Sequence, residues 1–151
     1  MDVSIIIINY NTFSLTCKCI ESLYKYNNGF SYEIILVDNA SSECDATLFL
    51  EKFPNINLVI SEKNLGFAGG NNLGIKHATG NFILLLNSDT ELIENSIFSC
   101  INYMKKNKNI GVLSPKLIFP DGTHQSVAQR FPSIKYQLIE LFRIQKLLPK
   151  K

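Results

Sequence analysis

The sequence predicts an α/β fold, in which a mostly parallel sheet has helices on both faces. Two observations support this prediction. Four short apolar runs are continuous rather than alternating, as in strands covered on both faces. They are Val3 to Ile8, Ile34 to Val37, Leu58 to Ile60 and Phe82 to Leu86. The segments between them have helical periodicity, and strands that alternate with helices form parallel sheets through right-handed crossovers.

The first two crossover segments predict helices. From Ser14 to Asn27, apolar side chains recur on one helical face before an Asn-Asn-Gly stop signal. In the next segment, Ala46 to Phe53 carries apolar residues at helical spacing, with Ser42 as the candidate N-cap and Pro54 as the end. Each helix therefore links two parallel strands.

The chain continues with two further helices and an extended segment. Ala68 to Thr79 predicts a shorter helix closed by Gly80, and Asn95 to Lys108 predicts another with an apolar face. We expect Ile110 to Phe119 to be extended and the Pro-Asp-Gly sequence at 120–122 to be a turn. This order of elements predicts an open, Rossmann-like sheet.

Composition and charge narrow the class of protein. Hydrophobic residues make up 46% of the 151 residues, enough for one compact domain, and the net charge of +2 is too small to indicate a nucleic-acid-binding surface. The four cysteines lack metal-ligand spacing and predict free thiols. No basic region precedes the first apolar run and no apolar stretch could span a membrane, so we expect a cytoplasmic protein.

The tail at 133–151 combines an apolar helical stripe with basic residues. The stripe consists of Ile134, Leu138, Leu141, Phe142 and Leu148. Two interpretations stay open. The tail is either a core helix whose covering partner is absent, so that the isolated chain self-associates, or an amphipathic helix that rests on the inner face of a membrane.

Polar side chains follow each of the four predicted strands. Asn9 to Asn11 follow the first strand, Asp38 and Asn39 the second, Asn64 the third, and Asn87 to Asp89 the fourth. Taken alone, each cluster is better explained as a turn or a helix cap. However, the carboxyl ends of parallel strands share the edge at which open α/β sheets bind ligands. The convergence of the four clusters therefore predicts a binding site.

The chemistry of these groups suits a nucleotide. Asp38 can accept hydrogen bonds from a base or a ribose, and Asp89 can coordinate a divalent cation that neutralises a diphosphate. In the segment 64–72, Gly69 and Gly70 would let the backbone approach a ligand closely, whereas the alternative is a glycine-rich helix start packed against the sheet. The segment matches neither the P-loop nor the dinucleotide fingerprint.

Four motifs in this order resemble the family-2 glycosyltransferases of the GT-A fold, over roughly residues 1–132. They are Ser4 to Asn11, Val37 to Ser42, Asn64 to Asn72 and Leu86 to Thr90. The later stretches 120–125 and 130–132 are similar to those of the rhamnosyltransferase-like branch. The resemblance implies a GT-A sheet that stops before the full acceptor half.

The resemblance also implies roles for individual residues. Asn9 and Asn11 would lie beside the nucleotide, Asp38 would contact the base, and Asp89 would match the last aspartate of the metal motif, whose first position is Asn87. The candidate metal site, for Mn²⁺ or Mg²⁺, is thus Asp89 with Asn87. The candidate nucleotide-binding residues are Asn9, Asn11, Asp38, Asn39, Asn64, Gly69, Gly70, Asn71 and Ser88.

The expected function is that of an inverting glycosyltransferase in cell-surface polysaccharide synthesis. The resemblance implies a single domain, 1–151, with a nucleotide-sugar-binding part at 1–112 and the start of an acceptor part at 113–151. Its donor would be a dTDP- or UDP-linked sugar, and its acceptor a saccharide or a lipid-linked saccharide.

The family's catalytic carboxylate has no counterpart in these residues. Asp121 lies in a Pro-Asp-Gly setting that favours a turn. We therefore expect the 151 residues alone to bind a donor without transferring its sugar at a family-like rate. The alternatives are a non-catalytic nucleotide-sugar-binding module and a sugar-phosphate nucleotidyltransferase, although the basic glycine-rich loop that the latter would need near the first strand is absent.

Overall fold

A computed structural model describes residues 1–125 together with 133 and 141. The chain divides into two compact units, Met1–Pro115 and Lys116–Lys151. The predicted stripe at 134–148 lies outside the described residues except for Leu141, which is exposed. The boundary at residue 112 between a nucleotide-sugar-binding part and an acceptor part stays a prediction.

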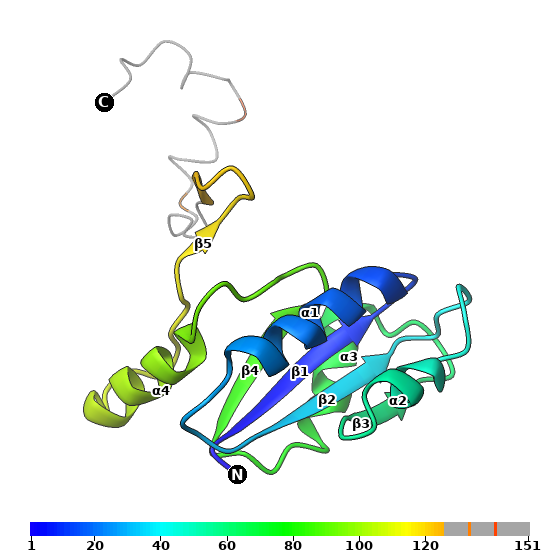
Figure 1. Cartoon of the computed structure of the whole chain (residues 1–151), viewed down its shortest axis with the longest axis horizontal. Coiled ribbons are helices and arrows are strands. Elements are labelled where there is room, and N and C mark those ends of the chain that lie inside the picture. The colour runs from blue at the N-terminus through cyan, green and yellow to red at the C-terminus, as the bar shows by residue number, and fades with distance from the viewer. Residues whose placement is uncertain (126–132, 134–140, 142–151) are drawn as a thin grey trace. The chain divides into compact units, whose positions relative to one another are not determined.

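The first unit contains a four-stranded parallel sheet (Figure 1). Its strands are β1 (Val3–Asn9), β2 (Tyr32–Asp38), β3 (Asn57–Ile60) and β4 (Phe82–Asn87), in the order β3-β2-β1-β4. Since β1 pairs in parallel with both β2 and β4, the chain crosses from one side of β1 to the other after β3. This arrangement confirms the predicted parallel sheet.

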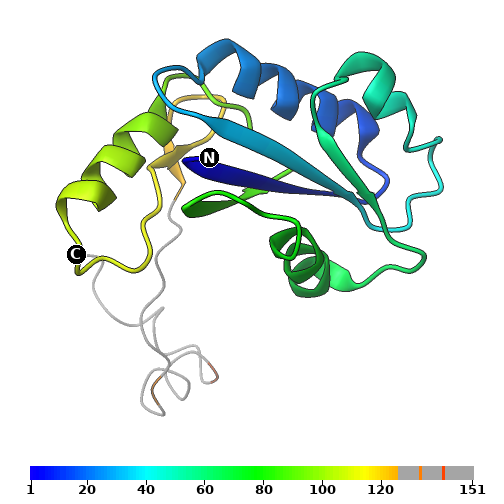
Figure 2. The same ribbon diagram turned by 90° about the horizontal axis from the view of Figure 1, so that it is seen from below.

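Helices cover both faces of this sheet, as the sequence predicts. The larger core cluster contains side chains from α1 (Phe13–Tyr26), α2 (Leu48–Lys52) and α4 (Ser96–Lys106), packed on one face. The smaller cluster lies under α3 (Gly66–Ile75) on the opposite face. Figure 2 shows α1 and α2 on one side of the sheet and α3 on the other.

The boundaries of α2 and α3 differ from the predicted ones. Ser42 is not an N-cap, because its backbone N–H donates to the side chain of Asn11 and the helix begins six residues later. Backbone bonds of the i to i+3 type form a tight turn ahead of α2 and shorten it. α3 begins earlier than expected and ends at Ile75, because turn-type bonds replace the helical pattern there.

The glycines of α3 allow the helix to approach β1 closely. A Cβ atom at Gly74 would lie 2.5 Å from Cγ2 of Ile6, and one at Gly70 would lie 3.2 Å from Cδ1 of Ile8. Both distances are shorter than ordinary van der Waals contacts. The close packing of α3 on β1 therefore explains why glycines occur inside a helix despite their low helix propensity.

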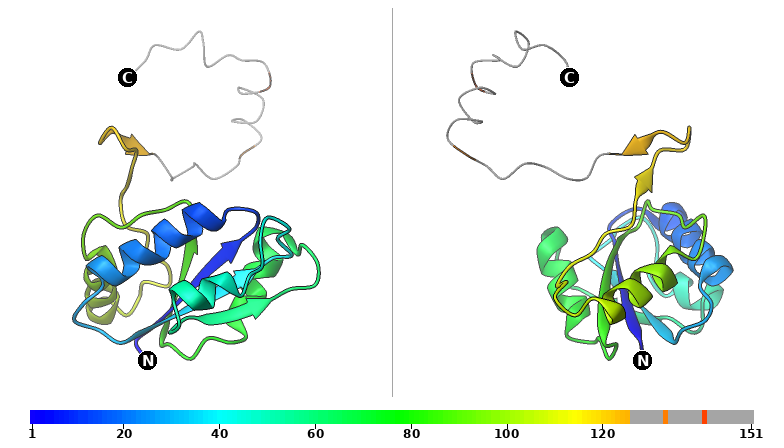
Figure 3. Two further views of the ribbon diagram at one scale, coloured as in Figure 1. Left: turned by 45° about the vertical axis from the view of Figure 1, so that its right-hand side comes forward. Right: turned by 90° about the vertical axis from the view of Figure 1, so that its left-hand side faces the viewer.

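In the second unit, the described residues form a hairpin of β5 (Leu117–Ile118) and β6 (His124–Gln125), drawn in yellow and orange in Figure 3. Thr123 donates from its backbone N–H (2.9 Å) and its hydroxyl (2.6 Å) to Oδ1 of Asp121, which confirms the predicted turn. Of the segment 110–119, which we predicted to be extended, only Leu117–Ile118 forms a regular strand. None of the described helices is long and apolar enough to cross a membrane.

Candidate functional site

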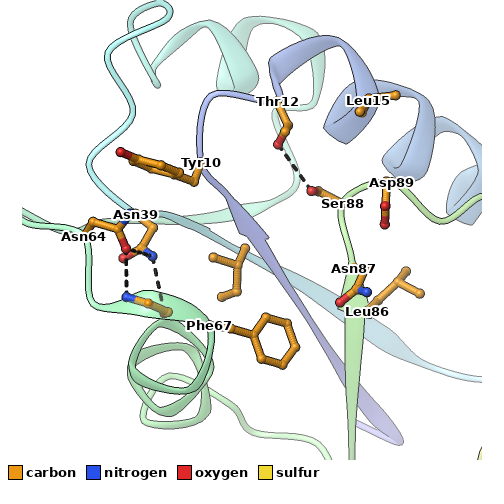
Figure 4. A pocket seen from close by; sticks show the side chains of 12 residues that line it. Tyr10, Thr12, Leu15, Asn39, Asn64, Phe67, Leu86, Asn87, Ser88 and Asp89 are labelled. Carbon is orange, nitrogen blue, oxygen red and sulfur yellow. Dashed lines mark hydrogen bonds between the residues drawn. The ribbon is translucent and has the colours of Figure 1, made fainter. Parts of the chain in front are cut away.

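A pocket of about 420 Å³ opens at the carboxyl end of the sheet, where the strand order reverses between β1 and β4. Open α/β sheets bind ligands at such switch points, and the volume lies within the range of small-molecule sites. Its lining residues are Ile8, Tyr10, Thr12, Leu15, Asn39, Asn64, Gly66, Phe67, Leu86, Asn87, Ser88 and Asp89 (Figure 4). Five of the predicted site residues therefore converge here.

Asn9 lies beneath the pocket with 1% of its surface exposed. Its Nδ2 donates to Oδ1 of Asp38 at 2.8 Å and to the hydroxyl of Ser41 at 2.9 Å. Its Oδ1 accepts from the hydroxyls of Thr12 at 3.1 Å and Thr16 at 2.9 Å. Since both ends of the amide are satisfied within the protein, Asn9 holds together the segments around the pocket.

Asp38 is buried next to Asn9 and accepts a second hydrogen bond from the backbone N–H of Ser41 at 3.1 Å. A carboxylate has further lone pairs, although Asp38 is only 3% exposed and is not among the residues that line the pocket. Asn11 adopts a left-handed conformation, with φ 53°, and its Oδ1 accepts from the backbone N–H of Ser42 at 2.8 Å. Asn11 therefore fixes the loop that follows β2.

A pair of amides fixes the loop that precedes α3. The Nδ2 of Asn39 donates to Oδ1 of Asn64 at 3.0 Å, and Oδ1 of Asn39 accepts from the backbone N–H of Leu65 at 2.9 Å. Asn64 also accepts from the backbone N–H of Gly66 at 2.8 Å. With φ +69°, Gly66 adopts a conformation that L side chains rarely adopt, and it turns the chain so that Phe67 lies at the pocket.

The fourth polar cluster forms the other wall of the pocket. Asn87 and Asp89 are exposed, and the hydroxyl of Ser88 lies 3.2 Å from that of Thr12. Cys19 packs behind this wall, and its thiol donates to the backbone carbonyl of Asn87 at 3.7 Å. Burial, followed by the nearby carboxylates of Asp89 and Glu91, raises the pKa of Cys19 to about 12, so it remains a neutral thiol.

The oxygen donors of this wall fit a divalent cation. Asp89 offers a carboxylate and Asn87 an amide oxygen, which are ligands that Mn²⁺ and Mg²⁺ prefer. Within the described part of the chain, no three His, Cys, Asp or Glu residues form a metal-binding group. A cation at Asp89 would therefore complete its coordination with oxygens of a bound diphosphate and water.

Other predicted residues lie outside the pocket lining. Gly69, Gly70 and Asn71 belong to α3, where Gly70 packs on β1 and Asn71 donates to the backbone carbonyl of Phe67 at 2.9 Å. Sequence reasoning assigned no role to Thr12. Its position three residues after a strand-end asparagine, one helical turn before Thr16, is the signal that could have identified it.

Replacing Asn9 by aspartate should destabilise the fold in a pH-dependent way. Asn9→Asp would place a second carboxylate 2.8 Å from Asp38 in a buried setting, at a cost on the order of 3 kcal/mol near pH 7. Repulsion raises one carboxyl pKa in the folded variant above its unfolded value. The deficit should therefore be small near pH 4 and grow as the pH rises through the raised pKa.

The measurement is urea unfolding of Asn9→Asp at several pH values, with Asn9→Leu as the control. The control loses the two bonds that Nδ2 donates, as Asn9→Asp does, and also the acceptor for Thr12 and Thr16. It adds no charge, so its deficit should vary less with pH. Equal pH profiles for the two variants would contradict the buried carboxylate pair.

The fold and the pocket define an α/β protein with an open parallel sheet and a ligand site at its topological switch point. The model of the glycosyl transferase family 2 matches residues 4–150. The chain therefore belongs to this family.

The names of two curated relatives refer to teichoic acid biosynthesis and to poly(ribitol-phosphate) glucosyl transfer. The chain is 29% identical over 126 residues to the minor teichoic acid biosynthesis protein GgaB of Bacillus subtilis, covering 80% of this chain and 14% of GgaB. It is 30% identical over 114 residues to the poly(ribitol-phosphate) beta-glucosyltransferase of Bacillus spizizenii, covering 72% of this chain and 18% of that enzyme. The chain thus spans less than a fifth of either relative.

Solved structures of S. aureus TarS share the fold. TarS 1-349 superposes with a TM-score of 0.64 at 23% identity, covering 72% of this chain and 33% of TarS 1-349. The complex of TarS 1-349 with UDP-GlcNAc gives a TM-score of 0.60 at 29% identity, covering 72% of this chain and 32% of that chain. The similarity confirms the GT-A-like sheet and spans about a third of TarS 1-349.

Proposed function

We propose that the chain is the donor-binding part of an inverting, metal-dependent glycosyltransferase of cell-surface polysaccharide synthesis. The observation that carries the proposal is the pocket at the switch point, in which Asn39 and Asn64 face the Asn87–Asp89 wall. A UDP-linked donor is supported by the TarS complexes with UDP and UDP-GlcNAc, and a dTDP-linked donor offers the same diphosphate. We propose hexosyl or rhamnosyl transfer as the reaction.

The two sides of the pocket suit different parts of a nucleotide sugar. Asp38 and Asn9 lie on the β1–β2 side, where a carboxylate can receive the N–H of a pyrimidine base. Asp89 lies on the β4 side, where a cation would neutralise the charge that accumulates on the departing diphosphate. The diphosphate needs this cation, because none of the described residues lining the pocket is Lys, Arg or His.

Transfer also requires an acceptor hydroxyl and a group that takes its proton. The described residues of the pocket include no second carboxylate besides Asp89. Asp121 accepts two hydrogen bonds from Thr123, which lower its pKa and leave it a turn residue. We propose that the acceptor is a saccharide or a lipid-linked saccharide and that a group outside this pocket takes its proton. We further propose that the protein acts in the cytoplasm, with the tail 133–151 in contact with a membrane or with a second copy of the chain.

The experiment that tests the proposal is a thermal-shift panel of nucleotide sugars, with and without Mn²⁺. A ligand that binds the folded state raises the apparent stability by mass action, about 2.7 kcal/mol at 100 times its Kd. UDP or dTDP sugars should stabilise the chain in the presence of Mn²⁺. If no nucleotide diphosphate stabilises it with either Mn²⁺ or Mg²⁺, the proposal is wrong.

Asp38→Ala should weaken the binding of UMP and UDP-GlcNAc to the same degree. The base is common to both ligands, and loss of a charge-assisted hydrogen bond costs roughly 1.5–3 kcal/mol, or about 10- to 150-fold in Kd. The measurement is calorimetric titration of the folded variant, with Ser41→Ala as a control that also removes a hydrogen bond from Asn9. A loss confined to UDP-GlcNAc would place the base elsewhere.

A further inference from the structure

A chain of hydrogen bonds connects the two sides of the pocket through Thr12. The hydroxyl of Thr12 donates to Oδ1 of Asn9 at 3.1 Å. It also lies 3.2 Å from the hydroxyl of Ser88 (Figure 4). Asn9 in turn donates to Asp38 at 2.8 Å. Thr12 is thus the link between the strand that carries Asn9 and the wall that carries Asp89.

The direction of each hydrogen bond in this chain is fixed by Asp38. A carboxylate only accepts, so the amide of Asn9 must turn its Nδ2 towards Asp38 and its Oδ1 towards Thr12. Because Oδ1 also only accepts, Thr12 must donate its single hydroxyl proton to Asn9. The hydroxyl of Thr16 lies 3.4 Å from that of Thr12, but it also donates its proton to Asn9. In the contact between Thr12 and Ser88, the donor is therefore Ser88.

This assignment determines what Ser88 can offer a ligand. Its one proton is used by Thr12, and no other hydrogen-bond partner of Ser88 occurs among the described residues. The free lone pairs of the Ser88 oxygen lie at the pocket, which favours a ligand group that donates and disfavours a phosphate oxygen. Within a bound nucleotide, the group between the base and the diphosphate that donates is a ribose hydroxyl.

We propose that Thr12 is a positioning residue that fixes the Ser88 hydroxyl as an acceptor for a ribose hydroxyl of the donor. The inference rests on the proposed function, since it presumes a nucleotide in the pocket. Thr12 would act through Ser88, because its own proton is already committed to Asn9.

The chain offers a matched pair of variants. Thr12→Val and Thr16→Val each replace a hydroxyl by a methyl group of similar size, and each removes one donor from Oδ1 of Asn9. Thr12 alone of the two contacts Ser88. Thr12 makes no side-chain cap bond to α1, so Thr12→Val costs the helix no cap. Thr12→Ser keeps the hydroxyl and should behave as the unmodified chain does.

The experiment compares the binding of UDP and 2′,3′-dideoxy-UDP, both with Mn²⁺, by calorimetric titration. Thr12→Val should weaken UDP binding roughly 2- to 10-fold, the range of one hydrogen bond, and should leave dideoxy-UDP binding unchanged. Thr16→Val should affect the binding of both ligands equally. Thr12→Ser should bind UDP and dideoxy-UDP with the same ratio of affinities as the unmodified chain. A double variant of Thr12→Val with Ser88→Ala should be no worse than Ser88→Ala alone.

Equal weakening of both ligands by Thr12→Val would overturn the proposal, as would a change in the Mn²⁺ concentration needed for binding. Failure of the unmodified chain to bind UDP or any other nucleotide would instead contradict the proposed function, and the ribose contact with it. The hydrogen bond between Thr12 and Ser88 can also be tested without a ligand. The backbone amide signal of Ser88 in NMR spectra should shift in Thr12→Val and stay in place in Thr16→Val, and the opposite result would exclude the link.

Discussion

Gly80→Ala should be severely destabilising, because its added methyl group would collide with backbone atoms. A Cβ at Gly80 would lie 2.4 Å from the backbone N of Ser4 and 2.6 Å from the carbonyl C of Val3. Backbone in the central strand cannot move away as a side chain can, so we expect a loss of about 3 kcal/mol or more. For a chain of this size, that lowers the melting temperature by roughly 6–12 °C.

Gly111→Ala is the matched control for this prediction. No atom lies within 4 Å of a Cβ at Gly111, and its backbone needs no left-handed conformation. The same chemical change should therefore alter the melting temperature by little, or raise it slightly through the unfolded chain. Circular dichroism melts of the two variants provide the measurement. Equal melting temperatures would show that the loop at Gly80 moves away from β1.

The sheet was predictable because its signal is local. Each strand contains a continuous apolar run, and three of the four end at a polar residue, which is Asn9, Asp38 or Asn87. The start of α2 was not predictable in this way. Ser42 is a good N-cap in isolation, but Asn11 accepts the hydrogen bond of its backbone N–H from a loop that lies 31 residues earlier. Tertiary hydrogen bonds of this kind override local capping preferences.

The candidate site was predictable in part for the same reason. Asn39, Asn64 and Asp89 could be placed at one edge because they come within four residues of a strand end, and all three line the pocket. The sequence could not separate groups that face the pocket from groups that support it. Asn9 has a polar side chain that is satisfied by four protein partners, and Gly70 serves helix packing. Both facts depend on contacts between distant segments.

Asp89→Asn should abolish the Mn²⁺-dependent part of nucleotide-diphosphate binding and leave the fold intact. Asp89 is exposed at the pocket and is the one carboxylate among its described lining residues. Losing that charge should weaken the cation, and with it the diphosphate, by about tenfold or more. UMP binding without Mn²⁺ should change little, because the base side of the pocket is untouched.

The matched control for Asp89→Asn is Glu91→Gln. Glu91 is also exposed, and it contributes with Asp89 to the raised pKa of Cys19, but it does not line the pocket. The change removes the same charge two residues away, so general electrostatic effects on a diphosphate are alike in both variants. UDP titrations with increasing Mn²⁺ should separate them: Glu91→Gln keeps the Mn²⁺ dependence of the unmodified chain and Asp89→Asn loses it. If both variants keep it while folded, the cation is held by other groups, and Asp89 is not its ligand.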